Sequence, residues 1–155
     1  MYTLIDIINK LIEIEKYERD IYEKITTMEE ISSNIKTVAK IFKIEKERHI
    51  FYYQKLKKRL EQEELPMIDI ILYDSVSPLF LSFKNRFIVP HPKTLQEIIH
   101  YAYQFEQENK ALIIDVKGRL LARESDAGEK IQEVLTVVIQ EKERHIQNLK
   151  QFLKK

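Results

Sequence analysis

The chain contains four stretches in which apolar residues recur at steps of three and four, the spacing that places them on one face of an α-helix. These stretches predict helices over about 2–25, from near Ser32 and Ser33 to just before Pro66, from Thr94 onward and from near Asp126 onward. Thr94-Leu-Gln-Glu97 reads as a capping box. The expected apolar stripes are Leu4, Ile8, Leu11, Tyr22 and Ile25; Ile35, Val38, Phe42, Tyr53, Leu56 and Leu60; Leu95, Ile99, Ala102, Ile113, Leu120 and Leu121; and Ile131, Val134, Val138, Leu149 and Phe152.

Between the second and third stretches the helical period is lost. The segment 65–93 holds Pro78, Pro90 and Pro92 together with apolar runs, so we expect a crossover that carries a short helix or an extended stretch along the length of a bundle. The chain then reads as a single all-α domain, 1–155, built from a hairpin over about 2–64, the crossover over 65–93, and a second hairpin over about 94–154.

Ionisable residues interrupt each apolar stripe. At about 100° per residue, Glu15 falls in the middle of the first stripe, His49 in the second, Glu106 in the third and His145 in the fourth. The helices that carry the histidines also place a glutamate and a lysine on the inner side, Glu45 with Lys46 and Glu141 with Lys142. Burying one unpaired charge costs several kcal/mol or more. These groups must therefore neutralise one another or bind something.

The two histidine segments are identical over six residues. Glu-Lys-Glu-Arg-His-Ile occurs at Glu45–Ile50 and again at Glu141–Ile146. A lone core histidine is more often structural than a ligand. The repetition of the same His with the same carboxylates favours a shared role for His49 and His145.

These segments resemble the ferritin-like superfamily, and more narrowly its rubrerythrin-like di-iron branch without a rubredoxin domain. The resemblance covers roughly Leu4–Leu60 and Leu95–Phe152: a glutamate followed seven residues later by tyrosine (Glu15, Tyr22), two acidic runs that end in His49 and His145, and Ala102-Tyr-Gln-Phe-Glu106. It implies a four-helix bundle of two hairpins joined by a long crossover, with iron, or manganese or zinc, at a di-metal centre that reacts with peroxide or oxygen. The ligands that it implies are Glu15, Glu45, His49, Glu106, Glu141 and His145, and its candidate catalytic residue is Tyr22.

The sequence departs from the family at one position in each copy. The family has a bridging glutamate three residues before the histidine, and here that position holds Lys46 and Lys142. A protonated lysine does not bind a metal and repels one. The alternative is therefore a metal-free descendant of the same fold, a structural or interaction module whose lysines form ion pairs with the carboxylates. In that case Tyr22 is a core aromatic residue with a hydrogen-bonded hydroxyl.

Composition narrows the classes of partner. The net charge of +1 gives no overall field for nucleic acid or an anionic membrane, and neither is expected as a partner. The absence of cysteine excludes disulfides, iron–sulfur clusters and an internal rubredoxin, so an enzyme of this kind would need an external electron donor. No signal peptide or apolar span is visible, which favours a cytoplasmic protein. The apolar crossover favours a homo-oligomer, most simply a dimer.

Overall fold

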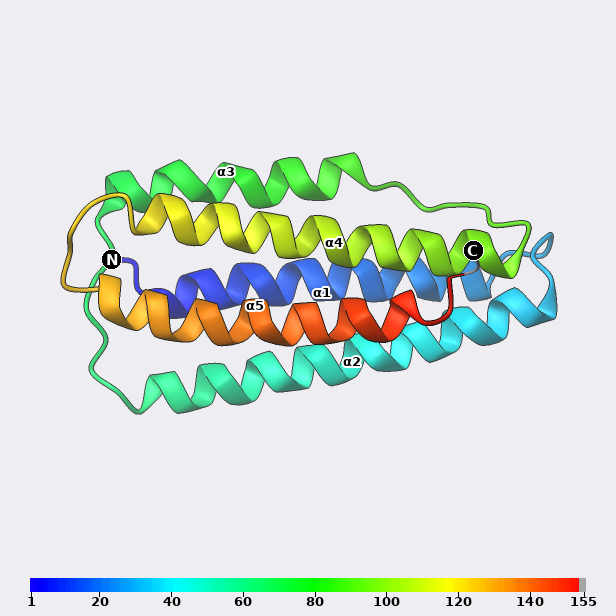
Figure 1. The fold of residues 1–155 in the computed structure, drawn as a ribbon, viewed down its shortest axis with the longest axis horizontal. Coiled ribbons are helices and arrows are strands. Elements are labelled where there is room, and N and C mark those ends of the chain that lie inside the picture. Colours follow the sequence, from blue (N-terminus) through cyan, green and yellow to red (C-terminus); the bar gives the residue numbers. More distant parts are fainter. Residues whose placement is uncertain (154–155) are drawn as a thin grey trace.

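A computed structural model describes residues 1–153, which contain five helices. They are α1 (Leu4–Thr26), α2 (Ser33–Glu61), α3 (Ile70–Arg86), α4 (Leu95–Leu120) and α5 (Gly128–Lys150). All five run along the long axis of a helical bundle (Figure 1). The all-α class and the four expected helices are confirmed, and the crossover holds a fifth.

The ends of the helices follow local side-chain chemistry. Thr3 and Asp6 form a reciprocal capping box at the start of α1, and the Thr94 hydroxyl accepts the backbone N–H of Glu97 at the start of α4. The Asp69 carboxylate accepts from the N–H of Ile71 and caps α3. Ser32 precedes α2 without a side-chain capping bond. The first two caps are the start signals expected of threonine followed three residues later by an acidic residue.

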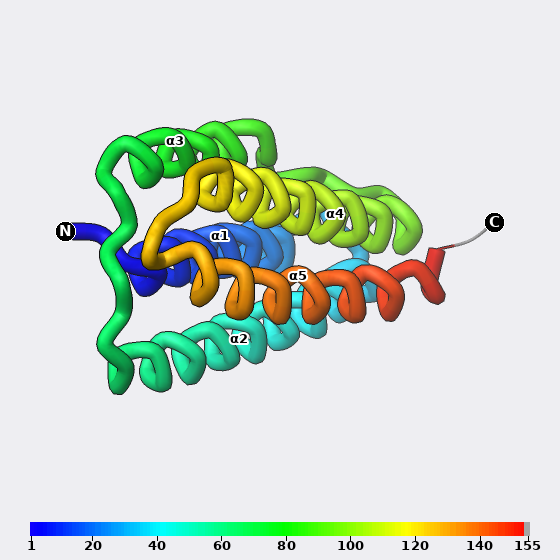
Figure 2. The backbone as a smooth tube through the Cα atoms, turned by 60° about the vertical axis from the view of Figure 1, so that its left-hand side comes forward, coloured from blue at the N-terminus to red at the C-terminus, as the bar shows by residue number. Residues whose placement is uncertain are grey.

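Helix α3 determines the direction of the second half of the chain. It returns the chain along the bundle, so that α2 and α4 run the same way and α1 and α5 run together in the opposite sense (Figures 1 and 2). Helix α1 packs against α2, α4 packs against α5, and α3 lies against α4 and α1. The sites on α1, α2, α4 and α5 can therefore meet at one level of the bundle.

The crossover is fixed at both of its ends. At its start, Tyr2 stacks on Tyr73 with ring centroids 3.8 Å apart, and the N–H of Ile68 donates to the carbonyl of Tyr2 at 2.7 Å. At its end, the hydroxyls of Tyr17 and Tyr101 donate to the carbonyls of residues 87 and 88. These contacts attach α3 to the rest of the bundle.

The apolar stripes form the core with two exceptions. The predicted members on α1 are all buried, whereas Leu95 and Phe152, at the outer ends of the third and fourth stripes, are 40% and 62% exposed. At the start of α4 the buried position is Ile98 instead. The inward-facing positions expected from the apolar period are thus correct along the helices and wrong at the start of α4 and just after the end of α5.

Candidate functional site

Seven polar residues lie buried at the middle of the bundle. Helix α1 contributes two of them, α2 two, α4 two and α5 one; they are Glu15, Glu18, Lys46, His49, Glu106, Asn109 and Lys142. Each continues the inward face of its helix, because residues three and four positions apart lie on the same side. Four helices thus bring their ionisable groups together inside an apolar shell.

Lys142 joins two of these helices through their carboxylates. Its Nζ donates to Glu15 Oε2 at 2.8 Å and to Glu106 Oε2 at 3.1 Å. Asn109 donates from Nδ2 to the same Glu15 oxygen at 2.9 Å. The ammonium of Lys142 therefore bridges α1 and α4 from α5.

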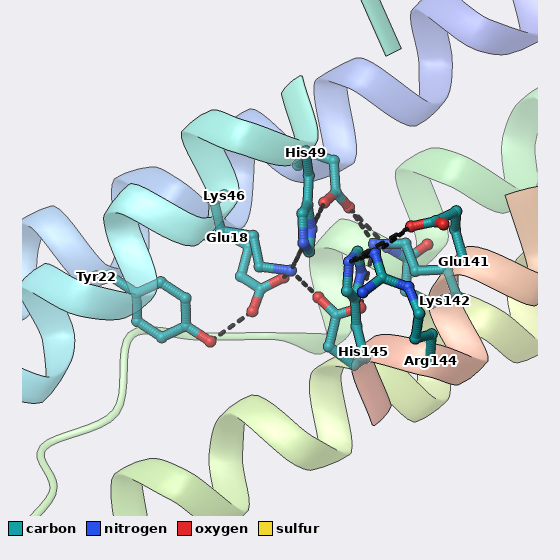
Figure 3. Close-up of polar contacts among 11 residues, drawn as sticks. Glu18, Tyr22, Lys46, His49, Glu141, Lys142, Arg144 and His145 are labelled. Carbon is teal, nitrogen blue, oxygen red and sulfur yellow. Dashed lines mark hydrogen bonds and ion pairs between the residues drawn. The ribbon is translucent and has the colours of Figure 1, made fainter. Parts of the chain in front are cut away.

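Lys46 occupies the other side of the same carboxylates. Its Nζ lies 3.0 Å from Glu18 Oε1 and 3.6 Å from Glu15 Oε1, and it forms an ion pair with Glu106 Oε1. One lysine from α2 thus contacts three buried carboxylates. Figure 3 shows Lys46 and Lys142 approaching the cluster from different helices.

The two lysines control the ionisation of Glu15. Burial alone would raise the pKa of this carboxyl, but the nearby charges of Lys142 and Lys46 hold the pKa well below its usual value. Burial likewise opposes the charged form of Lys142, yet Glu15 raises the pKa of that ammonium. Both groups are therefore charged in the folded protein at neutral pH.

Glu18 is the carboxylate in excess. Glu15, Glu18 and Glu106 face two ammonium groups, so one negative charge has no fixed cation of its own. Burial raises the pKa of Glu18, and the charge of Lys46 only partly offsets this. The Tyr22 hydroxyl donates to Glu18 Oε2 at 2.5 Å, and burial with the adjacent Glu18 charge raises the pKa of Tyr22 well above its usual value. Glu18 was not among the site residues expected from the sequence; its spacing of three from Glu15 and four from Tyr22 is the signal that points to this site.

The two repeated histidines stack on each other. The rings of His49 and His145 have centroids 3.9 Å apart and planes 9° from parallel. Because a carboxylate only accepts, His49 carries its proton on Nδ1 and donates to Glu15 Oε1 at 2.9 Å. Burial, together with Lys46, lowers the pKa of His49 to about 3, and burial with Lys142 lowers the pKa of His145 to about 4. Both rings are therefore neutral near pH 7.

Three of the six residues expected as metal ligands meet at this site. Glu15, His49 and Glu106 each offer a ligand atom within 4.8 Å of the others, and all three are buried. This spacing could hold a metal ion. The ammonium of Lys46 stands among the same atoms, since it also lies 3.3 Å from His49 Nδ1.

The other three lie toward the surface. Glu45 pairs with Arg48 at 2.5 Å and Glu141 pairs with Arg144 at 2.7 Å, each one helical turn along. The hydrogen bond from Arg144 lowers the pKa of Glu141. His145 lies with its Nε2 3.7 Å from Glu141, and within residues 1–153 its Nδ1 has no hydrogen-bond partner. The structure therefore does not bring these three to the carboxylates of α1 and α4.

Two cavities, each of 290 Å³, adjoin the site and share His49 and His145 in their walls. The first extends past Tyr22, Glu18 and Lys46 to apolar residues of α2 and of the C-terminal segment. The second is lined by two tyrosines of α2 and by the arginines that pair with Glu45 and Glu141, Arg48 and Arg144. The polar cluster is thus buried but lies next to space that a small molecule could enter.

No family model, no curated protein and no solved structure matches the chain. Within residues 1–153, the helices are too short or too polar to cross a membrane. The arrangement of the buried residues is therefore the basis for a functional conclusion.

Proposed function

We propose that this protein is a metal-free bundle of the ferritin-like type, a binding or structural module in which Lys46 and Lys142 take the positions of two metal ions. The observation that carries the proposal is the placement of Lys142 Nζ between Glu15 and Glu106, at 2.8 and 3.1 Å. The long crossover, with α2 and α4 running in the same direction, supports the ferritin-like arrangement. The lysines supply the positive charge that buried carboxylates need.

The donor set does not fit a pair of metal ions in this arrangement. A cation at Glu15, His49 and Glu106 would lie beside the ammonium of Lys46, where like charges repel strongly because the surroundings are apolar. His49 Nδ1 also carries the proton that it donates to Glu15, so it has no free lone pair toward the cluster. A metal would have to displace both a lysine and a proton.

Metal content tests the proposal. Protein purified without chelator and incubated with Fe²⁺, Mn²⁺ or Zn²⁺ under exclusion of air is expected to retain fewer than about 0.3 ions per chain. The reason is that Lys46 and Lys142 already pair with the carboxylates that would bind a metal. Mass spectrometry of the desalted protein measures this. One or two ions per chain would overturn the proposal.

A charge-reversal variant tests the same point in the opposite direction. Lys46→Glu with Lys142→Glu removes both ammonium groups and places a carboxylate three residues before each histidine. This variant is expected to gain stoichiometric iron. The matched control is Lys43→Glu with Lys130→Glu on the same two helices, where both lysines lie at the surface in pairs with Glu23 and Glu63. The control is expected to gain none.

A di-metal oxidoreductase that reacts with peroxide or oxygen is the second candidate. The close approach of Glu15, His49 and Glu106, all within 4.8 Å, favours it. In that case the bound metal would supply the redox chemistry, and an external donor would supply electrons. Stoichiometric metal in the unaltered protein, followed by peroxide consumption with a reductant, would support this candidate instead.

A homodimer remains part of the proposal. Apolar side chains are exposed on and around α3, and they are Met67, Ile70, Ile71, Leu81 and Ile88. Exposed apolar surface of this kind is typical of interfaces between subunits. Light scattering coupled to size-exclusion chromatography should give twice the chain mass of 18.7 kDa.

A further inference from the structure

Helix α3 carries almost no charge. Between Ile70 and Phe83 its only charged residue is Asp74, although 33% of the chain is charged. One side of the helix lies against α4 and α1, and within residues 1–153 no other helix covers the opposite side (Figures 1 and 2). Charged residues are depleted at the centre of protein interfaces relative to the rest of the surface. The uncovered side of α3 therefore has the composition of an interface.

A row of exposed residues runs along this uncovered side. Its positions follow one another at alternating steps of three and four, the spacing of a helix face that packs on a second helix. We call this row the α3 stripe, and its members are Ile71, Asp74, Pro78, Leu81, Asn85 and Ile88. The side chains of Ile71, Leu81 and Ile88 are each more than half exposed. The α3 stripe thus presents apolar side chains at regular intervals and has no partner helix in its own chain.

The order of residues in the α3 stripe is self-complementary. From either end the pattern is apolar, polar, apolar, apolar, polar, apolar. When a second copy of α3 lies antiparallel to the first in this register, the opposed pairs are Ile71 with Ile88, Asp74 with Asn85, and Pro78 with Leu81. Apolar residues then meet apolar residues and polar residues meet polar ones. A two-fold interface between identical subunits requires this kind of self-complementary surface.

The charges at the two ends of α3 fit the same arrangement. Asp74 lies near the start of the helix and Lys84 near its end, and within residues 1–153 neither side chain forms an ion pair. In the antiparallel pair, Asp74 of one copy lies beside Lys84 of the other and opposite the Asn85 amide, which can donate to the carboxylate. In a parallel pair, Asp74 would lie beside Asp74, and like charges across an interface are unfavourable. The charges therefore favour the antiparallel direction.

We propose that a second copy of this chain docks on the α3 stripe about a two-fold axis, with the two α3 helices antiparallel and Leu81 of each copy against Pro78 of the other. Ile71 and Ile88 close the interface at both of its ends. The inference rests on the homodimer included in the proposed function, and it goes beyond it by naming the interface, its direction and its register. The buried lysines take no part in this contact.

The dissociation constant of the dimer tests the surface. Sedimentation equilibrium of the full chain measures this constant, and circular dichroism checks that each variant keeps its helices. Leu81→Glu places a charge on each side of the proposed axis and is expected to weaken the dimer at least about a hundredfold, because the interface would bury unpaired charges. The control Ile44→Glu changes an exposed apolar residue of α2 and should dimerise like the unaltered chain. A Leu81→Glu protein that dimerises as tightly as the control would overturn the inference.

A disulfide experiment tests the direction, since the chain has no cysteine of its own. Asp74→Cys and Asn85→Cys face each other in the antiparallel register, so an equimolar mixture of the two variants is expected to cross-link under mild oxidation. Each variant alone is expected to cross-link little, because two copies of the same position lie about 16.5 Å apart along the helices, and a disulfide needs Cα atoms within about 7 Å. Cross-linking of each variant with itself, or no cross-link in a dimeric mixture, would overturn the antiparallel register.

Reversal of the end charges tests the register independently. Asp74→Lys brings two lysines together at both symmetric contacts and is expected to weaken the dimer about tenfold. Adding Lys84→Asp to the same chain should recover most of this loss, because the pair is then restored with its signs exchanged. A double variant as weak as Asp74→Lys would contradict the pairing of these two residues.

The inference and the proposed function fail separately. A dimer that no α3 variant weakens keeps the homodimer and removes the α3 stripe as its interface. A chain that stays monomeric at every concentration removes both the homodimer and the inference, and leaves the α3 stripe to a different protein. Stoichiometric metal in the unaltered protein removes the metal-free core and does not affect the α3 stripe.

Discussion

The two copies of Glu-Lys-Glu-Arg-His-Ile have the same sequence and different surroundings. In both copies the first glutamate pairs with the arginine at the surface, and the lysine side chain is buried in the core. The histidines differ, since His49 donates to Glu15 whereas His145 has an unpaired Nδ1 within residues 1–153 and is more exposed. The position of a segment in the bundle therefore decides which of its residues become part of the polar cluster.

The lysines also differ between the copies. Lys142 bridges two carboxylates that α1 and α4 supply, while Lys46 additionally faces Glu18, the carboxylate whose pKa is raised. The cluster near Lys46 can adjust its charge by a proton on Glu18, and Lys142 has no such partner in direct contact. The two equivalent lysines thus contact different sets of carboxylates.

Removal of Lys142 should have the largest effect. Lys142→Met leaves Glu15 and Glu106 short of a cation inside the core and is expected to lower the free energy of unfolding by roughly 3–5 kcal/mol. Lys46→Met should cost less, because Glu18 can take up a proton. Urea unfolding measures both, with surface Lys130→Met as control. A Lys142→Met protein as stable as the unaltered chain would refute the ion-pair core, and adding Glu15→Gln should recover part of the loss.

Acid should destabilise the protein through the histidines. The pKa of His49 is lowered from 6.5 to about 3 and that of His145 to about 4. The unfolded chain therefore binds these protons first, and stability present above about pH 6.5 is lost as the pH falls toward the folded values. For His49 this loss is on the order of 3 kcal/mol between pH 7 and pH 4. Glu15, whose pKa is also lowered, adds a further loss below about pH 4.5.

The two histidines can be separated by substitution. Urea unfolding at a series of pH values should show that His49→Gln removes more of the acid sensitivity than His145→Gln, because His49 is the more deeply buried ring. Equal effects of the two variants would contradict the unequal surroundings described above.

The hydroxyl of Tyr22 should have an intermediate effect. Tyr22→Phe removes the donor to Glu18 Oε2 and leaves a buried acceptor without its partner, which is expected to cost about 1–3 kcal/mol. Tyr52→Phe, at a half-exposed position on α2, serves as the control and should change stability little. Thermal and urea unfolding give the comparison. An unchanged Tyr22→Phe protein would contradict a stabilising hydrogen bond from Tyr22 to Glu18.

The surface pairs should matter least. Glu45→Gln and Glu141→Gln each break an exposed ion pair with an arginine and should change the free energy of unfolding by less than about 1 kcal/mol. Added to the Lys46→Glu/Lys142→Glu variant, neither substitution should change the iron content. A loss of bound iron there would instead restore Glu45 or Glu141 as a ligand.

Much of this arrangement could be predicted from the sequence. The period of apolar residues gave four helices, and the same helical faces placed Glu15, Lys46, His49, Glu106 and Lys142 inside. Helix α3 was harder to foresee, because Pro78 lies within it and hides its period. The helical period placed Glu45 and Glu141 on the inner side, whereas their side chains lie toward the surface and pair with the arginines three residues further on. A metal-ligand role for these two glutamates stays a prediction.

Other features depend on contacts between segments distant in the sequence. The stacking of His49 on His145 requires α2 and α5 to lie at one height, which a single-helix pattern does not contain. The excess charge at Glu18 follows only when the charges on four helices, α1, α2, α4 and α5, are counted together. Such properties arise from the assembled bundle.

The lysine bridge has a consequence for how the helices align. Val138 and Ile146, one turn before and after Lys142, are both buried and apolar, so the apolar face of α5 alone would tolerate a slide of one turn, about 5.4 Å. Such a slide would set an aliphatic side chain against Glu15 and carry the ammonium away from both of its carboxylates, which it now meets at 2.8 and 3.1 Å. The misaligned packing would be penalised by buried unpaired charge. The buried ion pairs of the polar cluster therefore select one register of α5 among those that its apolar contacts alone would permit.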